Sequence, residues 1–90
     1  MTLKYKGKEY EIKYSIRAML MYENVKQEKE FNSLTDVVTL FYCFFVCCTK
    51  DYSLSFDEFL EWVDDNPDSI ILFGEWAQKV TLNNNKLKKD

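Results

Sequence analysis

The sequence has 90 residues and a net charge of −3 at pH 7, and 47% of its residues are hydrophobic. A chain of this length forms one small domain that buries roughly 60–65% of its unfolded surface, and an aromatic content of 17% argues against a disordered chain. Histidine is absent from the sequence, so the usual general base and the commonest nitrogen ligand for metals are missing.

The charges are unevenly distributed. Residues 1–30 carry seven basic and five acidic side chains, whereas residues 31–82 carry two basic and nine acidic ones. An acidic middle repels phosphate backbones, so nucleic acid is an unfavoured partner and only the basic N-terminal residues leave an opening for it. The N-terminal residues contain no apolar run of the signal-peptide kind, which predicts a cytoplasmic protein.

Residues 1–14 predict a β-hairpin. In TLKYKGKEYEIKY apolar residues alternate with lysine and glutamate, and Lys6-Gly7 is placed as a two-residue turn. Two strands are marginal alone, so the apolar face must pack on helices or an edge must pair with another chain. The expected pairs are Tyr5 with Lys8, Leu3 with Tyr10 and Met1 with Ile12.

A first helix is expected over residues 16–25. Ser15 is its candidate N-cap, and the apolar spacing predicts that Ile16, Met19 and Leu20 face inward. The polar stretch KQEKEFN then reads as a loop, after which Ser33 can cap a second helix.

The second helix, expected over residues 34–48, is unusually apolar. Its VVTLFYCFFVCC run lacks the polar stripe of a surface helix. At a length of about 22 Å it is too short for a bilayer core of about 30 Å, so no membrane span is expected. A small monomer can barely cover such a helix, so we expect a homo-oligomer or a partner on one side. The candidate partner or self-association surface consists of Phe41, Phe44, Phe45, Trp62 and Trp76.

Three cysteines, Cys43, Cys47 and Cys48, lie in the same apolar run. Their number is odd, they form no C-x-x-C motif, and no histidine is available to complete a zinc site. They are therefore expected to be buried, reduced thiols. No metal or cofactor is predicted.

The stretch DYSLSFDEFLEW superficially resembles the end of a calcium-binding loop. With Glu58 as the closing glutamate of an EF-hand, Cys47 would be the first ligand and Tyr52 would replace the required glycine. A thiol is a poor ligand for a hard cation, so calcium is rejected. Ser55 with Glu58 forms a capping box instead, which predicts a helix start.

That third helix is amphipathic, with an acidic side formed by residues such as Asp57, Glu61 and Asp64. Such a side usually points to water, although it could also attract a basic partner. The apolar side consists of Phe56, Phe59, Leu60 and Val63.

A last helix is expected to begin at Asn66-Pro67, which suit its cap and first turn. Its inward face is predicted to contain Ile70, Phe73, Ala77 and Val80. NNNKLKKD, residues 83–90, is expected to be a disordered polar tail. The prediction is one α+β, mainly helical domain over residues 1–82, in which a hairpin (1–14) precedes about four short helices (15–82) around one small core.

Catalytic motifs are missing from the sequence. Without histidine no Ser-His or Cys-His pair can form, and two isolated glycines make no phosphate-binding loop. The pattern favours a non-catalytic protein.

The layout resembles the small tail assembly chaperones of long-tailed bacteriophages and prophages. The resemblance covers about residues 3–80 and depends on the order of KGKEYEIKYSIRAMLMYE, SLTDVVTLFY and LSFDEFLEWVDDNPDSI. These proteins share a hairpin around GK-x-Y, an acidic S-x-x-E/D-x-x-x-x-L/V helix, and a closing helix after NP or DP.

The resemblance implies a cytoplasmic protein in a bacterial host that binds the long, helical, aggregation-prone tape measure protein before the tail tube polymerises. It implies several copies acting together and carries over no catalytic residue. The alternative is a small oligomeric adaptor or regulatory protein whose hairpin contacts nucleic acid through Lys4, Lys6, Lys8 and Lys13.

Overall fold

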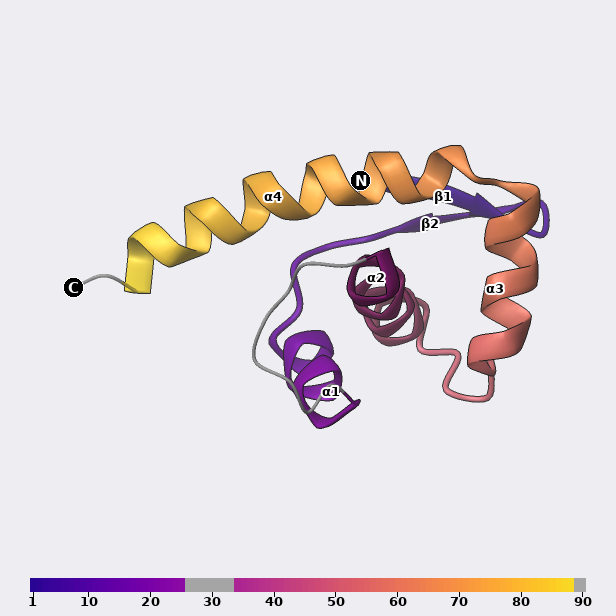
Figure 1. Cartoon of the computed structure of the whole chain (residues 1–90), viewed down its shortest axis with the longest axis horizontal. Helices are drawn as coiled ribbons and strands as arrows, with labels where there is room; N and C mark the ends of the chain where they lie inside the picture. The colour runs from indigo at the N-terminus through magenta and orange to yellow at the C-terminus, as the bar shows by residue number, and fades with distance from the viewer. Residues whose placement is uncertain (26–33, 89–90) are drawn as a thin grey trace.

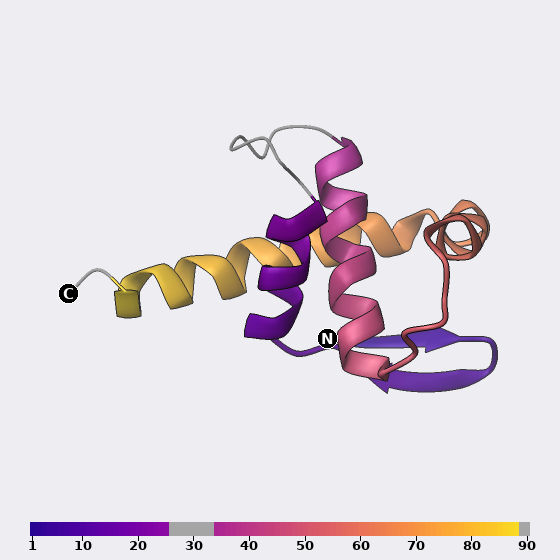
Figure 2. The ribbon, with the colours of Figure 1, turned by 90° about the horizontal axis from the view of Figure 1, so that it is seen from below.

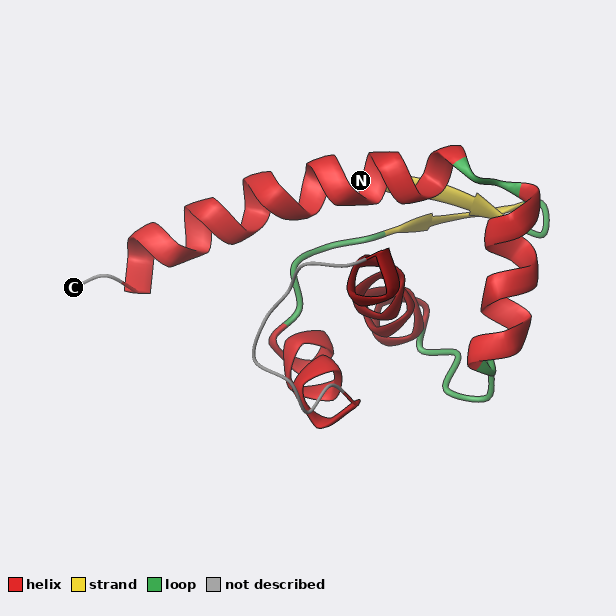
Figure 3. Ribbon diagram, viewed as in Figure 1, coloured by secondary structure: helices red, strands yellow, loops and turns green. Residues whose placement is uncertain are grey.

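The structure is a computed structural model that describes residues 1–25 and 34–88, with side chains as far as Val80. In this part of the chain an antiparallel hairpin precedes four helices (Figure 1, Figure 3), which confirms the α+β, mainly helical class. Ser33 and the loop predicted over residues 26–32 lie outside the described residues. The elements are β1 (Thr2–Tyr5), β2 (Lys8–Glu11), α1 (Ile16–Val25), α2 (Leu34–Thr49), α3 (Phe56–Asp65) and α4 (Asp68–Lys88).

The hairpin has the predicted turn and register. Lys6 and Gly7 have φ angles of 50° and 80°, as a two-residue type I′ turn requires. The strands pair Leu3 with Tyr10 and Tyr5 with Lys8. The ladder continues to Met1 and Ile12, where the Ile12 N–H donates to the Met1 carbonyl at 2.7 Å.

Helix α1 begins as predicted but buries a different side. The Ser15 hydroxyl accepts from the Ala18 N–H at 3.1 Å, which confirms the N-cap. The prediction that Ile16 and Leu20 face inward is wrong, because both side chains are 57% exposed. Ala18 and Tyr22 are buried instead. The small Ala18 side chain permits close approach to α2, and Tyr22 lies one turn further along the same side.

Helix α2 lies at the centre of the fold. Figure 2 shows α1 alongside it, and the hairpin, α3 and α4 enclose its other sides. It spans Leu34–Thr49, one residue beyond the predicted end. In the described part of the chain, no helix is long and apolar enough to cross a bilayer. The buried side chains of α2 are Val38, Leu40, Phe41, Cys43, Phe44, Phe45, Val46 and Cys47.

Helix α3 begins with the predicted capping box. The Glu58 N–H donates to the Ser55 hydroxyl at 3.1 Å, and the Ser55 N–H donates to the Glu58 carboxylate at 3.0 Å. Phe59 and Val63 are buried, whereas Phe56, at the outer border of the predicted apolar side, is 37% exposed.

Helix α4 is longer than predicted. It begins at Asp68, directly after Pro67, and continues to Lys88. The expectation of a disordered tail from residue 83 is therefore wrong for residues 83–88. Neither glycine nor proline interrupts the sequence after Gly74, and each residue added to an existing helix gains a hydrogen bond. The C-terminal part of α4 extends beyond the other elements (Figure 1).

The capping box generates a stability prediction. Replacing Ser55 with alanine leaves the Glu58 N–H without its acceptor, so we expect the free energy of unfolding to fall by about 1 kcal/mol in urea denaturation. Ser53→Ala is the matched control, because the Ser53 hydroxyl donates only to the Asp51 carboxylate, at 2.8 Å, outside the helix. Equal losses for the two variants would contradict a capping role.

Candidate protein-interaction surface

The predicted surface of phenylalanines is inside the chain. Phe41, Phe44 and Phe45 are 0%, 3% and 1% exposed. The expectation that they form a partner or self-association surface is therefore wrong. The short elements cover α2 more completely than expected because the hairpin, α3 and α4 each contribute an aromatic side chain to it.

Ring contacts explain how this cover works. Phe41 stacks on Phe73 of α4 with centroids 4.6 Å apart, and it meets Phe59 of α3 edge-on at 5.0 Å. Phe45 contacts Tyr5 of the hairpin at 4.9 Å. Such pairs contribute about 0.5–1.5 kcal/mol each beyond the area that they bury. The aromatic cluster thus joins three elements to α2.

The two tryptophans lie at the border of this cluster. Trp62 contacts Tyr5 at 5.6 Å and Phe45 at 6.0 Å, and Trp76 contacts Phe44 at 5.7 Å. Both indole rings are half-buried. Of the five residues predicted to form the surface, these two keep intermediate exposure and the three phenylalanines do not.

Pairs of exposed apolar side chains lie on α1 and α4. Ile16 and Leu20, spaced one helical turn apart, form what we call the α1 face, and each is 57% exposed. Ile71 and Leu72, the α4 pair, are 61% and 54% exposed. In the sequence, the i, i+4 spacing of Ile16 and Leu20 marks the α1 face, but the same spacing predicts a side that faces the core. Other exposed apolar side chains are Val25, Leu34, Tyr52 and Phe56.

The acidic side of α3 faces water as predicted. Asp57, Glu61, Asp64 and Asp65 are all exposed. Because none is buried or bound to a described cation, their combined negative charge is available to steer a basic partner.

A pocket lies between the hairpin and the segment joining α2 to α3. Its volume is about 400 Å³. The Lys6 and Lys8 ammonium groups lie 5.4 Å and 5.5 Å from the ring centroids of Tyr5 and Tyr10. Hydrogen bonding from Ser55 holds the pKa of Glu58 below its ordinary value, and the charge of Lys6 adds to this effect. The lining residues are Tyr5, Lys6, Lys8, Tyr10, Asp51, Ser53, Leu54 and Glu58.

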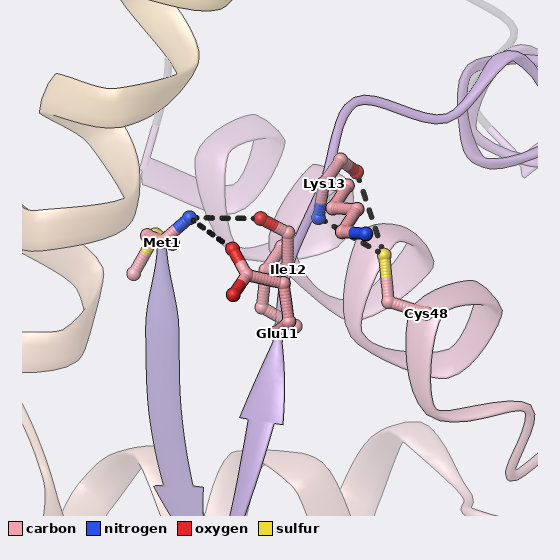
Figure 4. A network of polar contacts seen from close by, with 5 residues as sticks. All are labelled: Met1, Glu11, Ile12, Lys13 and Cys48. Atoms are coloured by element: carbon pink, nitrogen blue, oxygen red, sulfur yellow. Dashed lines mark hydrogen bonds and ion pairs between the residues drawn. The ribbon is translucent and has the colours of Figure 1, made fainter.

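The three cysteines are either buried or in contact with the backbone. Burial raises the pKa of the Cys43 thiol to about 12 and also raises the pKa of Cys47. The Cys48 sulfur lies 3.4 Å from both the N–H and the carbonyl oxygen of Lys13 (Figure 4). This contact connects the end of α2 to the strand exit. Figure 4 also shows the Met1 ammonium donating to the Ile12 carbonyl at 2.9 Å, with the Glu11 carboxylate at 3.5 Å.

Metal-ligating side chains do not gather in the part of the chain that the structure describes, where no three of His, Cys, Asp or Glu are placed to hold an ion. Comparison with models of protein families, with curated proteins and with solved structures finds no match for this chain. The functional argument therefore depends on its own residues and their geometry.

The aromatic cluster predicts a large difference between core and surface substitutions. Phe41→Ala removes a fully buried ring, so we expect the free energy of unfolding to fall by about 3–5 kcal/mol. Leu20→Ala on the exposed α1 face should change it by less than about 0.5 kcal/mol. Urea denaturation measures both, and Phe41→Leu replaces Phe41→Ala if the latter does not fold. Similar losses at the two positions would contradict the assigned core.

The burial of Cys43 predicts that its thiol reacts slowly in the folded chain. In the folded chain Cys43 should react with a disulfide reagent far more slowly than in urea, because only the thiolate reacts and burial keeps the thiol protonated. Its pKa rises from an ordinary value of 9.0 to about 12. Between these values the unfolded chain binds fewer protons, so stability should fall as pH rises through this window. A Cys47→Ala/Cys48→Ala variant isolates Cys43, and native reaction as fast as the unfolded rate would contradict its burial.

Proposed function

We propose that this chain is a non-catalytic tail assembly chaperone of the phage type, which acts in the cytoplasm of a bacterial host. Its client is an aggregation-prone helical region of a tape measure protein. The chaperone holds this region until tail assembly begins. The contact surfaces in this proposal are the α1 face and the α4 pair rather than the buried phenylalanines.

The order of elements supports this proposal. A hairpin built on Gly7-Lys8, a short helix, an apolar helix, an acidic capped helix and a closing helix follow one another along the chain. These are the features on which the sequence resemblance depends. The capping box at Ser55 and the helix that begins after Pro67 support the proposal.

The observation that carries the proposal is exposed apolar surface outside a completed core. Single exposed leucines are ordinary on protein surfaces. Here the side chains come in pairs, Ile16 with Leu20 and Ile71 with Leu72, and each of the four is more than half exposed. Ile16 and Leu20 lie one helical turn apart on one side of α1, whereas Ile71 and Leu72 are neighbours in the chain. An amphipathic client helix can lay its apolar face on surfaces of this kind.

Charge supports the same role. The exposed carboxylates of α3 give this part of the surface a negative potential, which would speed encounter with basic segments of a client. An apolar contact then supplies the affinity, because charge pairs at a rim contribute little by themselves.

Self-association is part of the proposal, since apolar pairs that hold a client helix can also hold another copy when no client is present. We expect species larger than the 10.8 kDa chain in sedimentation at high concentration. The alternative is an oligomeric adaptor whose hairpin contacts nucleic acid. It has less support, because the exposed lysines of the hairpin alternate with Glu9 and Glu11.

Capture of the client tests the proposal. We expect the tagged chain, co-expressed with a tape measure protein, to retain it near-stoichiometrically and to keep it from precipitating. Leu20→Asp and Leu72→Asp should each reduce retention at least about tenfold, because a charge cannot be buried unpaired at an apolar contact. Ser53→Asp, at an exposed position outside both helical surfaces, is the matched control.

Three results would contradict the proposal or relocate its surface. Recovery of the chain alone, or with nucleic acid that salt releases, would favour the adaptor alternative. Retention unchanged by both aspartate variants would show that the client binds elsewhere. Circular dichroism of each variant, compared with the unmodified chain, confirms that a loss of retention is not a loss of folding.

A further inference from the structure

On the outer side of β2, the backbone groups of Glu9 and Glu11 have no partner among the described residues. Met1 and Ile12 form a hydrogen-bonded pair: the Ile12 N–H donates to the Met1 carbonyl at 2.7 Å, and the Met1 ammonium donates to the Ile12 carbonyl at 2.9 Å. In an antiparallel pair, bonded and non-bonded positions alternate along each strand. The N–H and carbonyl groups of Glu9 and Glu11 in β2 therefore point away from β1.

At Glu9 and Glu11 this outer edge of β2 is open, whereas at the next position of the row, Lys13, Cys48 at the end of α2 contacts the backbone. The sheet has two strands, and among the described residues no backbone group bonds to the outward groups of Glu9 or Glu11. Figure 2 shows β2 along the lower border of the molecule, with the end of α2 next to the end of this strand. Strand edges of this kind are templates for pairing with another chain.

The side chains along this edge select the charge of an added strand. Glu9 and Glu11 are exposed, and across the hairpin they lie opposite Lys4 and Thr2. Opposite charges at directly facing positions stabilise strand pairs, whereas like charges destabilise them. Lysine or arginine at alternate positions of an added strand would thus lie beside Glu9 and Glu11, as Lys4 lies opposite Glu9 on the other side.

A second copy of the chain does not fit the same edge by two-fold pairing. Two β2 strands joined through their outward groups place Glu9 or Glu11 of one copy opposite Glu9 or Glu11 of the other in each central register. Facing carboxylates repel, and this is a common protection against self-pairing of edges. The charge pattern therefore disfavours two-fold pairing of β2 and favours a basic strand.

The pocket beneath the hairpin could receive a side chain from the inner face of an added strand. Lys8 and Tyr10 point to the inner side of β2 and line the pocket together with Asp51 and Glu58. A residue of the added strand next to Tyr10 would project its side chain toward this opening of about 400 Å³. Strand-addition sites commonly take affinity from the backbone and specificity from pockets for alternate side chains.

We propose that the outer edge of β2 is a docking edge for an extended basic segment of a partner protein. The segment adds a third strand antiparallel to β2, with lysine or arginine beside Glu9 and Glu11 and one inward side chain at the pocket. This site is separate from the helical surfaces assigned to the tape measure protein and does not depend on that assignment.

Amide exchange in the presence of a peptide tests the docking edge. The probe is a fluorescein-labelled heptapeptide in which lysine alternates with valine, and its control replaces each lysine with glutamate. We expect the lysine peptide to bind in fluorescence anisotropy and to slow exchange of the Glu9 and Glu11 amides at least about tenfold in NMR, because both would gain an acceptor. The glutamate peptide should do neither.

A proline variant separates backbone pairing from charge attraction. Glu9→Pro removes the outward N–H but no bond within the hairpin, and proline is tolerated at edges of this kind. We expect it to bind the lysine peptide about tenfold more weakly than Glu9→Ala, which loses the same charge. Persistent slow exchange of the Leu3 and Tyr10 amides checks that the hairpin is intact; otherwise a lysine peptide N-methylated at alternate residues makes the same comparison.

Several results would overturn the docking edge. Absence of binding at millimolar peptide, or equal binding by Glu9→Pro and Glu9→Ala, would exclude backbone pairing. Peptide binding without slower amide exchange at Glu9 and Glu11 would show that charge attraction, and not backbone pairing, explains the binding. Slower exchange at these amides on raising the chain concentration alone would identify a second copy as the occupant and contradict the basic-partner assignment.

Discussion

Burial of the α2 aromatic rings is the constraint on which the other elements depend. Because α2 is apolar on nearly every side, each remaining element must present an apolar side chain to it. Tyr5 does so from β1, Ala18 from α1, Phe59 from α3 and Phe73 from α4, and all four are buried. The hairpin and the three other helices are too small to form separate cores, so their common contact with α2 makes one domain of them.

Complete cover of α2 moves the candidate interaction sites to the outside of the covering elements. The α1 face and the α4 pair lie on helices whose other sides are committed to the core, and the docking edge lies on a strand whose inner face packs on Phe45 through Tyr10. Apolar helical faces and a charged strand edge suit different partners. The proposed helical surfaces and the docking edge share no residues. A helical partner and an extended partner would therefore bind different parts of the molecule.

The candidate site was predicted poorly from the sequence. Apolar spacing identified Ile16 and Leu20 as one side of a helix, but spacing alone does not say whether that side meets the core or the solvent. The opposite side, which contains Ala18 and Tyr22, is the buried one, and a residue as small as Ala18 allows two helices to approach closely. Conversely, Phe41, Phe44 and Phe45 were assigned to a surface because the amount of cover supplied by distant segments cannot be counted along the chain.

Local features were determined by the sequence itself. The Lys6-Gly7 turn, the strand register, the Ser15 cap and the capping box at Ser55 depend on residues within a few positions of one another, so short-range geometry is enough to define them. The direction in which α1 faces, the closure of the core around α2 and the free outer edge of β2 were decided only by the tertiary structure. Each depends on which distant segments come together, because burial and edge pairing are properties of the whole fold.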